Sequence, residues 1–364
     1  MLTLPLPVIV ALALAYTAAK AWLGGEHKRW HPVMTTWVGM VAAQSLLVAL
    51  VQHYGWLGLR WLQPISAAAL PPLAWCAFLT VQVRALAWRD AVHVSAPVLT
   101  LICLWVWPDA LDVMVLASYV GYGAALLLAL RPQAPELPLA RLGSGSLPRW
   151  LWRIVALSLW VSALGDMLIW LDQTLQMGQW RTPLIGAMSS LVLLTLGLVG
   201  LSPEWQVSAE PQTPEPLPQP KTDASPPPAG IVGAGSGGGV DDAANDAALL
   251  SQLDAHMRDA QPWLNPDLTL IALARKLGVP AKTLSAAVNR RTGDNVSRYV
   301  NQFRIDHACR LMLAGEPVTT AFLTSGFNTK SNFHREFQRV HGVAPTQWVA
   351  QNAGRTDNDS KAPE

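Results

Sequence analysis

The chain has 364 residues, a length compatible with two domains. Hydrophobic residues make up 51% of it and charged residues only 14%, whereas a soluble domain usually carries about 25% charged residues. This composition excludes a chain that is water-soluble throughout, and the net charge of +2 says little until it is divided by region. The three cysteines, Cys76, Cys103 and Cys309, have no short spacing, which argues against a disulfide framework or a zinc site.

Seven apolar stretches occupy the first part of the chain. Most of them reach the roughly 20 residues that a helix needs to cross the hydrocarbon core of a bilayer. We predict a transmembrane helical domain over residues 1–202, with spans at approximately 3–23, 32–53, 62–82, 91–107, 111–130, 151–172 and 182–201. The fourth stretch is short and is the least secure. A signal peptide is disfavoured for the first, because no basic segment precedes it and further spans follow.

Lys and Arg are divided unevenly between the connections of these spans. The odd-numbered connections and their borders carry nine such residues, Lys20, Lys28, Arg29, Arg84, Arg89, Arg131, Arg141, Arg149 and Arg153, against two, Arg60 and Arg181, in the even-numbered ones. Because cytoplasmic loops carry the excess of positive charge, the odd connections are predicted to be cytoplasmic. Seven spans then place the N-terminus outside and the C-terminus inside.

Asp166, in the stretch "SALGDMLIW", is the notable ionisable residue within a predicted span. A charge in lipid is costly, so such a residue faces the interior of the bundle or marks a site. Ligand or proton sensing and simple structural polarity are both compatible with it. Many of the 17 Trp residues lie at predicted span ends, which is typical of an interfacial belt; a Trp-lined ligand pocket is the alternative.

Residues 203–245 are predicted to be a disordered linker, rich in Pro and then in Gly, because they hold too few apolar residues to build a core. The Pro half is expected to be stiff and the Gly half loose. The Pro spacing is also compatible with a ligand of an SH3-type domain. A tether of this kind would let the domain that follows stand away from the membrane.

Residues 246–352 have the composition of a soluble helical domain, and residues 353–364 are expected to be a disordered tail. Between 251 and 350, twelve Lys and Arg oppose seven Asp and Glu, a net charge of +5 that suits a polyanion. The stretch "LTLIALARKLGVPAKTLSAAVNRRTG" predicts helix, tight turn, helix, with Thr269 as the cap and Gly278 in the turn. Its second helix turns Leu284 and Val288 inward and presents on one side Lys282, Ser285, Ala286, Asn289 and Arg290.

The stretch "NVSRYVNQFRIDHACRLMLAG" predicts a long helix with Leu313 on its buried face, after which the helix-turn-helix pattern recurs in "VTTAFLTSGFNTKSNFHREFQRVHG". There Phe327, Phe333 and Phe337 are predicted to face the core. The side chains predicted to remain outside are Lys330, Ser331, Asn332, His334 and Arg335. A connecting helix of about 20 residues is roughly 30 Å long, close to the 34 Å between successive major-groove faces of B-DNA.

Residues 262–349 resemble the DNA-binding domain of the AraC/XylS family of bacterial transcription regulators. The resemblance is carried by "NPDLTLIALARKLGV", "LSAAVNRRTGDNVSRYVNQFRIDHACRLMLAG" and "GFNTKSNFHREFQRVHGVAPTQW". It covers about a quarter of the chain, and the membrane half is not part of it. By the resemblance, the two recognition helices would offer the polar residues named above, together with Ala286, to DNA.

Two departures affect how this domain would read DNA. Ala286 stands where the family often has Arg, so weak base reading is expected from the first unit. Ala321–Phe322 stands where the family usually has Ile–Ala, and the larger Phe is expected to push the helices of the second unit apart or rotate them.

The sequence therefore predicts an all-α protein: a polytopic bundle, a disordered linker and a double helix-turn-helix domain. The expected function is a membrane-anchored one-component transcription regulator, with the bundle as sensor or dimerisation module. The expected partners are double-stranded promoter DNA, the lipid bilayer, RNA polymerase for an activator, a second copy in a homodimer, and an unidentified signal ligand. No catalytic, cofactor or metal motif is found.

The resemblance and the charge bias place the protein in a bacterial inner membrane, with the DNA-binding domain in the cytoplasm. Two alternatives stay open. One is a membrane transporter or enzyme with a degenerate DNA-binding appendage, and the other is a bundle that only anchors.

Overall fold

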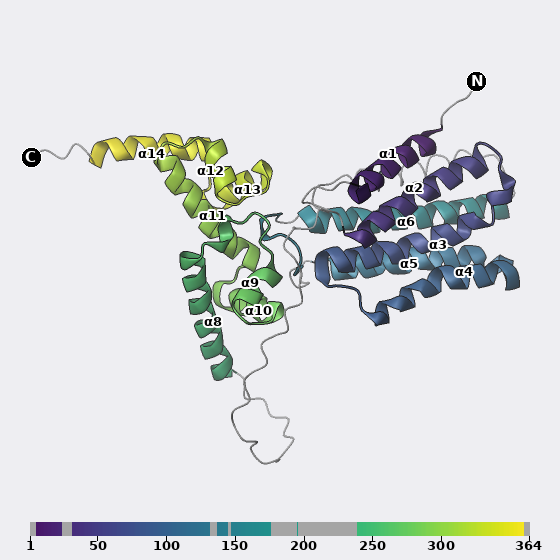
Figure 1. Cartoon of the computed structure of the whole chain (residues 1–364), viewed down its shortest axis with the longest axis horizontal. Helices are drawn as coiled ribbons and strands as arrows, with labels where there is room; N and C mark the ends of the chain where they lie inside the picture. Colours follow the sequence, from purple (N-terminus) through teal and green to yellow (C-terminus); the bar gives the residue numbers. More distant parts are fainter. Residues whose placement is uncertain are drawn as a thin grey trace, which may run out of the picture.

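The computed structural model describes residues 5–23, 31–131, 137–144, 147–175, 195 and 239–359. The described residues fold into helices and connecting turns, with one isolated antiparallel bridge between Arg141 and Thr269. Two bodies are visible in Figure 1: an N-terminal bundle, residues 5–175, and a C-terminal domain, residues 239–359. The expected all-helical architecture is confirmed for the described part of the chain.

In the described part of the N-terminal bundle there are six α-helices. Their bounds are α1 Leu6–Leu23, α2 Pro32–Gln52, α3 Leu62–Phe78, α4 Ser95–Val106, α5 Leu111–Ala129 and α6 Leu147–Thr174. Short helical turns extend or join them: η1 Leu57–Leu59, η2 Leu79–Val83, η3 Trp88–Val94, η4 Pro108–Ala110 and η5 Leu142–Ser144. In Figure 1 the helices run along a common direction, so their connections lie at the two ends of the bundle.

Large aromatic side chains fill the core of the bundle. Trp37 of α2, Phe78 of α3 and Trp152 of α6 are almost fully buried, and the Trp152 ring centroid lies 6.2 Å from that of Trp37 and 5.4 Å from that of Phe78. Gly123 lets α5 approach α6, because a Cβ atom there would lie 2.5 Å from the ring of Trp160. These contacts join α2 and α3 to α6, and α5 to α6.

Among the residues that the structure describes, five helical segments are long and apolar enough to cross a bilayer, judged by length and composition. They are Pro32–Gln52, Leu62–Val83, Trp88–Val106, Leu111–Ala129 and Leu147–Leu171. The fourth expected span, 91–107, is lengthened by the 3₁₀ turn η3 that precedes α4. The first expected span contains a shorter apolar helix, Pro7–Lys20, and the expected span 182–201 lies outside the described residues.

Seven α-helices build the C-terminal domain. They are α8 Gly239–Asp259, α9 Leu270–Lys276, α10 Ala281–Thr292, α11 Val296–Leu313, α12 Val318–Thr324, α13 Lys330–His341 and α14 Pro345–Asp359, with the turn η7 Pro262–Leu264 after α8. Two boundaries differ from the expected ones. Helix α8 begins at Gly239, inside the expected linker 203–245, and α14 extends to Asp359, beyond residue 352. Most of the expected linker, residues 203–238, lies outside the described residues.

The C-terminal domain has two hydrophobic cores, one for each helix-turn-helix unit. Leu253, Leu273, Leu284 and Val288 lie in the first core, which joins α8 to α9 and α10. The second core contains the predicted Phe residues, 327, 333 and 337, all at most 3% exposed. Leu313 is 48% exposed instead of buried, because α11 turns the preceding residue, Met312, toward the second core.

Thr269 caps α9 as predicted, and Thr329 caps the recognition helix α13. The Thr269 hydroxyl accepts a hydrogen bond from the backbone N–H of Ala272 at the start of α9. Thr329 plays the same part for α13 by accepting from the N–H of Asn332. Gly278, in the turn between α9 and α10, has a φ of 68°, a conformation that is costly for residues with a Cβ atom. The turn between α9 and α10 therefore has the left-handed glycine predicted for it.

Candidate nucleic-acid interface

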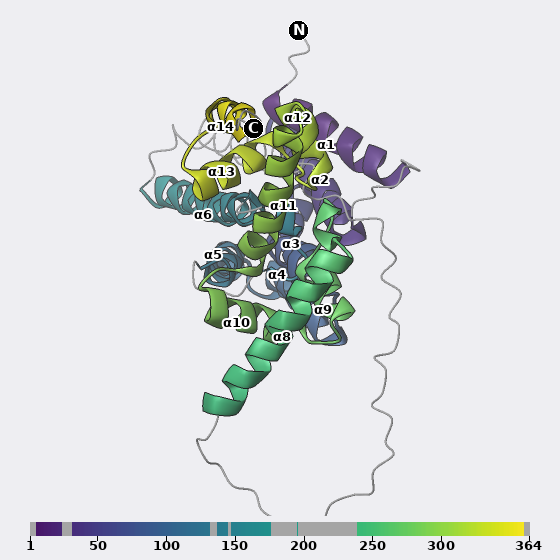
Figure 2. The ribbon, with the colours of Figure 1, turned by 90° about the vertical axis from the view of Figure 1, so that its left-hand side faces the viewer.

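Helix α11 separates the two helix-turn-helix units and sets their spacing. Figure 2 shows α9 and α10 at one end of α11, with α12 and α13 at the other. Its 18 residues correspond to a length of roughly 27 Å. This length is comparable to the spacing of successive major-groove faces along B-DNA, about 34 Å. A spacing of this order is compatible with two helices that enter neighbouring grooves.

The predicted recognition residues of α10 form a partly exposed face. Lys282 and Asn289 are exposed, whereas Ser285 and Ala286 are half-buried. Arg290 is exposed but engaged: its Nε and Nη2 atoms donate to the carboxylate of Asp246 on α8 at 2.7 and 2.8 Å. The Arg290 guanidinium holds the pKa of the Asp246 carboxyl below its ordinary value. The expectation that Arg290 is free to contact DNA has to be modified, because this side chain fastens α8 to α10.

The predicted recognition residues of α13 divide into an outward and an inward set. Lys330, Ser331 and Arg335 are exposed, and His334 is half-buried. Asn332 is 3% exposed, so the expectation that it remains outside is wrong. Its side chain is covered by residues 137–144 of the bundle and by Arg335, which donates to its Oδ1 atom. The buried face of α13 therefore includes a polar residue that helical periodicity had placed on the surface.

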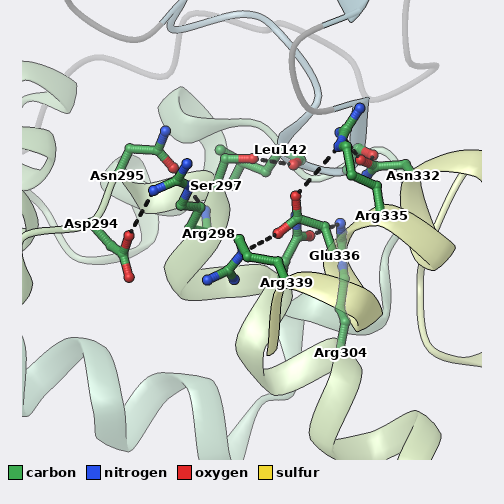
Figure 3. Close-up of polar contacts among 12 residues, drawn as sticks. Leu142, Asp294, Asn295, Ser297, Arg298, Arg304, Asn332, Arg335, Glu336 and Arg339 are labelled. Atoms are coloured by element: carbon green, nitrogen blue, oxygen red, sulfur yellow. Dashed lines mark hydrogen bonds and ion pairs between the residues drawn. The ribbon is translucent and has the colours of Figure 1, made fainter. Parts of the chain in front are cut away.

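Glu336 organises the arginines of α13. Its carboxylate is mostly buried and lies 3.0 Å from the Nε atom of Arg339 and 3.7 Å from that of Arg335. Figure 3 shows both arginines beside it. Arg339 is the more buried partner, with 31% of its side chain exposed, against 49% for Arg335. The outer part of the Arg335 side chain faces solvent.

Arg304, in the middle of α11, is a fully buried cation that helical periodicity did not single out. Its Nε and Nη2 atoms donate to the carbonyl oxygens of Trp263 and Asn265 at 2.8 and 2.9 Å, and Nη1 donates to Asn301 Oδ1 at 3.3 Å. Burial lowers the pKa of Arg304 to about 10, so the guanidinium stays charged at neutral pH. Arg304 thereby connects the turn η7, and through it the first unit, to α11, the helix between the two units.

A strip of the bundle, residues 137–144 between α5 and α6, lies on this domain. Arg141 Nε is 3.0 Å from Asp267 Oδ1, and the Leu142 N–H donates to the carbonyl of Leu268 at 2.8 Å. The Ser297 hydroxyl at the start of α11 donates to the Leu142 carbonyl at 2.5 Å, and both residues are visible together in Figure 3. These interdomain contacts could not be foreseen from the sequence, since the partners are separated by more than a hundred residues.

Asp166 lines a cavity inside the N-terminal bundle. The cavity has a volume of about 1040 Å³. Helices α2, α3, α5 and α6 contribute to its wall, with Gln44, Asp112 and Tyr119 among the polar lining residues and Trp37, Trp61 and Trp170 among the aromatic ones. The structure therefore places Asp166 beside a space within the bundle that a small ligand could fill. Among the described residues there is no group of His, Cys, Asp and Glu suited to holding a metal ion.

Comparison with known proteins supports the assignment of the C-terminal region. Residues 273–351 match a family model described as a helix-turn-helix domain of the AraC type. The match begins within α9, includes all of α10 to α13 and ends within α14. No curated protein and no solved structure matches the chain. The match supports a helix-turn-helix domain of a DNA-binding regulator at residues 273–351, joined to a bundle whose apolar helices are compatible with a membrane.

Proposed function

We propose that this protein is a membrane-anchored one-component transcription regulator that binds promoter DNA sequence-specifically through α10 and α13. The single observation that carries the proposal is the pairing of two helix-turn-helix units on α11, because residues 273–351, which include α10 to α13, match a helix-turn-helix family. The bundle would hold this domain at the cytoplasmic face of a bacterial inner membrane. The distribution of Lys and Arg between the loops supports that orientation.

The proposed DNA contacts come from residues of two kinds. Lys282 and Lys330, near the starts of α10 and α13, are exposed cations suited to phosphate oxygens. Asn289 and Arg335 have side chains that can pair with base edges, Asn with adenine and Arg with guanine. Ser285, Ala286, Ser331 and His334 would line the same two surfaces. Ala286 is too short to hydrogen-bond a base, so α13 is proposed to supply most of the base reading.

Charge reversal on α13 tests this proposal in the full-length protein. We expect Lys330→Glu combined with Arg335→Glu to abolish the preference for duplexes selected from a random library over scrambled duplexes. Losing a phosphate contact should also flatten the plot of log affinity against log salt by about 0.9 per contact. Arg310→Glu is the matched control, because Arg310 is exposed on α11 and outside both recognition helices. An unchanged preference in the α13 variant would favour the alternative of a membrane transporter or enzyme with a degenerate appendage.

The bundle is proposed to sense a signal through the cavity that contains Asp166. A charged group in the interior of a membrane domain marks a site by default, and the apolar and aromatic wall suits a partly apolar ligand. We expect Asp166→Asn to abolish the response of a target promoter to the signal while protein level and selective DNA binding persist. A normal response in that variant would leave the bundle as an anchor or a dimerisation module.

Further partners follow from the proposed function. A regulator that activates transcription would contact RNA polymerase, and a second copy of the chain would be recruited if the operator contains two sites. Crosslinking and sequencing of DNA bound in cells, with Arg335→Ala as control, identifies the operator. Its neighbouring genes would point to the signal.

A further inference from the structure

The segment that joins α5 to α6 contacts both bodies of the protein. On the bundle side, Leu137 packs against the hydrophobic core and the Leu139 N–H donates to the carbonyl of Gln82 at 3.1 Å. On the other side, the Pro138 carbonyl accepts from the N–H of Ile271 in α9 at 3.2 Å. Neighbouring residues of one short segment therefore fasten the end of the bundle to the start of the first helix-turn-helix unit.

The C-terminal domain has a docking surface that fits this segment. Leu142 is 4% exposed and belongs to the first core of that domain. Gly143 lies against the buried guanidinium of Arg304, where an added Cβ atom would be 2.7 Å from Nη1. Arg304 is held by backbone carbonyls and has little room to retreat. The surface therefore accepts a residue without a side chain at position 143 and an apolar one at 142.

Docking of this segment occupies the amide nitrogen of Asn332 on the predicted recognition helix. Its Nδ2 atom donates to the Gly143 carbonyl, and its Oδ1 atom accepts from Arg335. Bidentate recognition of adenine by an Asn side chain uses the same amide nitrogen and oxygen. Arg335, the base-reading residue proposed for α13, contacts Asn332 and Glu336 of the same helix. The docked state thus holds the Asn332 amide against the segment, next to Arg335.

We infer that residues 137–144 are an autoinhibitory latch that must leave the C-terminal domain before α13 can read DNA. This inference rests on the proposed DNA-binding function. In Figure 1, α9, α10 and α13 lie on the side of α8 and α11 that is nearer the bundle, so undocking also frees the approach to these helices. If about nine molecules in ten are docked, the latch weakens the apparent affinity for DNA about tenfold.

The latch provides a direct path between the bundle and the DNA-binding domain. In the sequence it lies between α5 and α6, which contribute Asp112 and Asp166 to the wall of the cavity. A ligand that changes the relative position of these helices changes the distance between the two ends of the latch. The latch thus gives the signal a route through residues 137–144 that does not depend on the expected linker at 203–245.

Substitution of Gly143 tests the latch in the full-length protein in lipid nanodiscs. Gly143→Leu should clash with Arg304, release the segment and raise the affinity for library-selected duplexes about tenfold. Hydrogen exchange reports docking independently: the amides of Leu142 and Ile271, which donate across the interface, should lose protection. Gly121→Leu on α5 is the matched control, since an added Cβ there meets no atom within 4 Å, and it should change neither measurement.

A charge swap provides a second test that does not depend on the folding of the Gly143→Leu variant. Arg141→Asp should release the latch by opposing Asp267, and adding Asp267→Arg should restore both amide protection and the weaker DNA binding. Loss of protection with unchanged or weaker DNA binding overturns autoinhibition, and so does a wild-type segment without protection. If the wild type and the released variants alike fail to distinguish selected from scrambled duplexes, the proposed function fails together with the inference. If the wild type binds selectively and release of residues 137–144 does not strengthen that binding, only the latch is refuted.

Discussion

Replacing Arg304 by lysine is expected to destabilise the C-terminal domain by about 3 kcal/mol while leaving its DNA-facing surface unchanged. The guanidinium is fully buried and donates to the carbonyls of Trp263 and Asn265, which lie on the turn after α8. A planar guanidinium presents its donors in a fixed fork, whereas an ammonium is a compact point donor on a flexible stem. Lysine therefore cannot satisfy both carbonyls from the same position on α11.

The magnitude follows from the groups that lose partners. One buried carbonyl left without a donor costs about 1–3 kcal/mol, and a hydrogen bond from a charged group contributes about 1.5–3 kcal/mol. The remaining attraction of the ammonium for one carbonyl offsets part of this loss. A net destabilisation of about 3 kcal/mol is large against a total stability of about 5–15 kcal/mol for a typical domain.

Pulse proteolysis of the full-length protein in urea measures this effect without separating the domains. The fraction of intact C-terminal domain should fall at a lower urea concentration in the Arg304→Lys variant than in the wild type. Arg310→Lys is the control, because Arg310 is exposed on the same helix and should change stability by less than about 0.5 kcal/mol. Equal urea midpoints for the two variants would refute the argument that the guanidinium of Arg304 holds the turn η7 and α11 together.

Three further predictions concern other parts of the molecule. Because Arg290 lowers the pKa of Asp246, the ion pair stabilises the contact of α8 with α10 at pH values above the ordinary pKa of 3.8. This stabilisation is lost as pH falls through the lowered pKa. Hydrogen exchange of α8 should show this step, and Asp246→Asn should remove it. Gly123→Val should destabilise the bundle in detergent by about 1–3 kcal/mol, because the added side chain collides with Trp160. Gly121→Val should have no such effect. Equal melting temperatures for the two variants would contradict the close approach of α5 and α6. Added Gly and Ser residues within the expected linker 203–238 should leave promoter regulation intact, and complete loss of regulation in a reporter assay would argue for coupling through the linker.

The latch changes how a signal is expected to reach DNA. From the sequence, a flexible linker cannot transmit a rigid rotation, so changes in dimerisation or local concentration are the favoured mechanism. The contacts of residues 137–144 supply a second route, which depends on direct docking. The two mechanisms differ in one respect that can be measured, since only the docking route is sensitive to Gly143 and Arg141.

Much of the helix-turn-helix domain could be predicted from its sequence because the controlling interactions are local. Helical periodicity places Leu284, Val288 and the three Phe residues of the second unit in the cores, where the structure has them. The cap at Thr269 and the left-handed turn at Gly278 depend on residues within a few positions. Apolar stretches likewise predict membrane-length helices, since hydropathy is also a local property.

Only the tertiary structure decided which polar residues of that domain are available to a partner. Asn332 and Arg290 have the periodicity of surface residues. Yet Asn332 is covered by Gly143, which is 189 positions away, and Arg290 is bound by Asp246, which is 44 positions away. Arg304 is charged and yet fully buried, because backbone carbonyls 39 and 41 positions before it accept its donors. Periodicity reports the two faces of one helix, but the partners of each face are set by segments that the fold brings together from far along the chain.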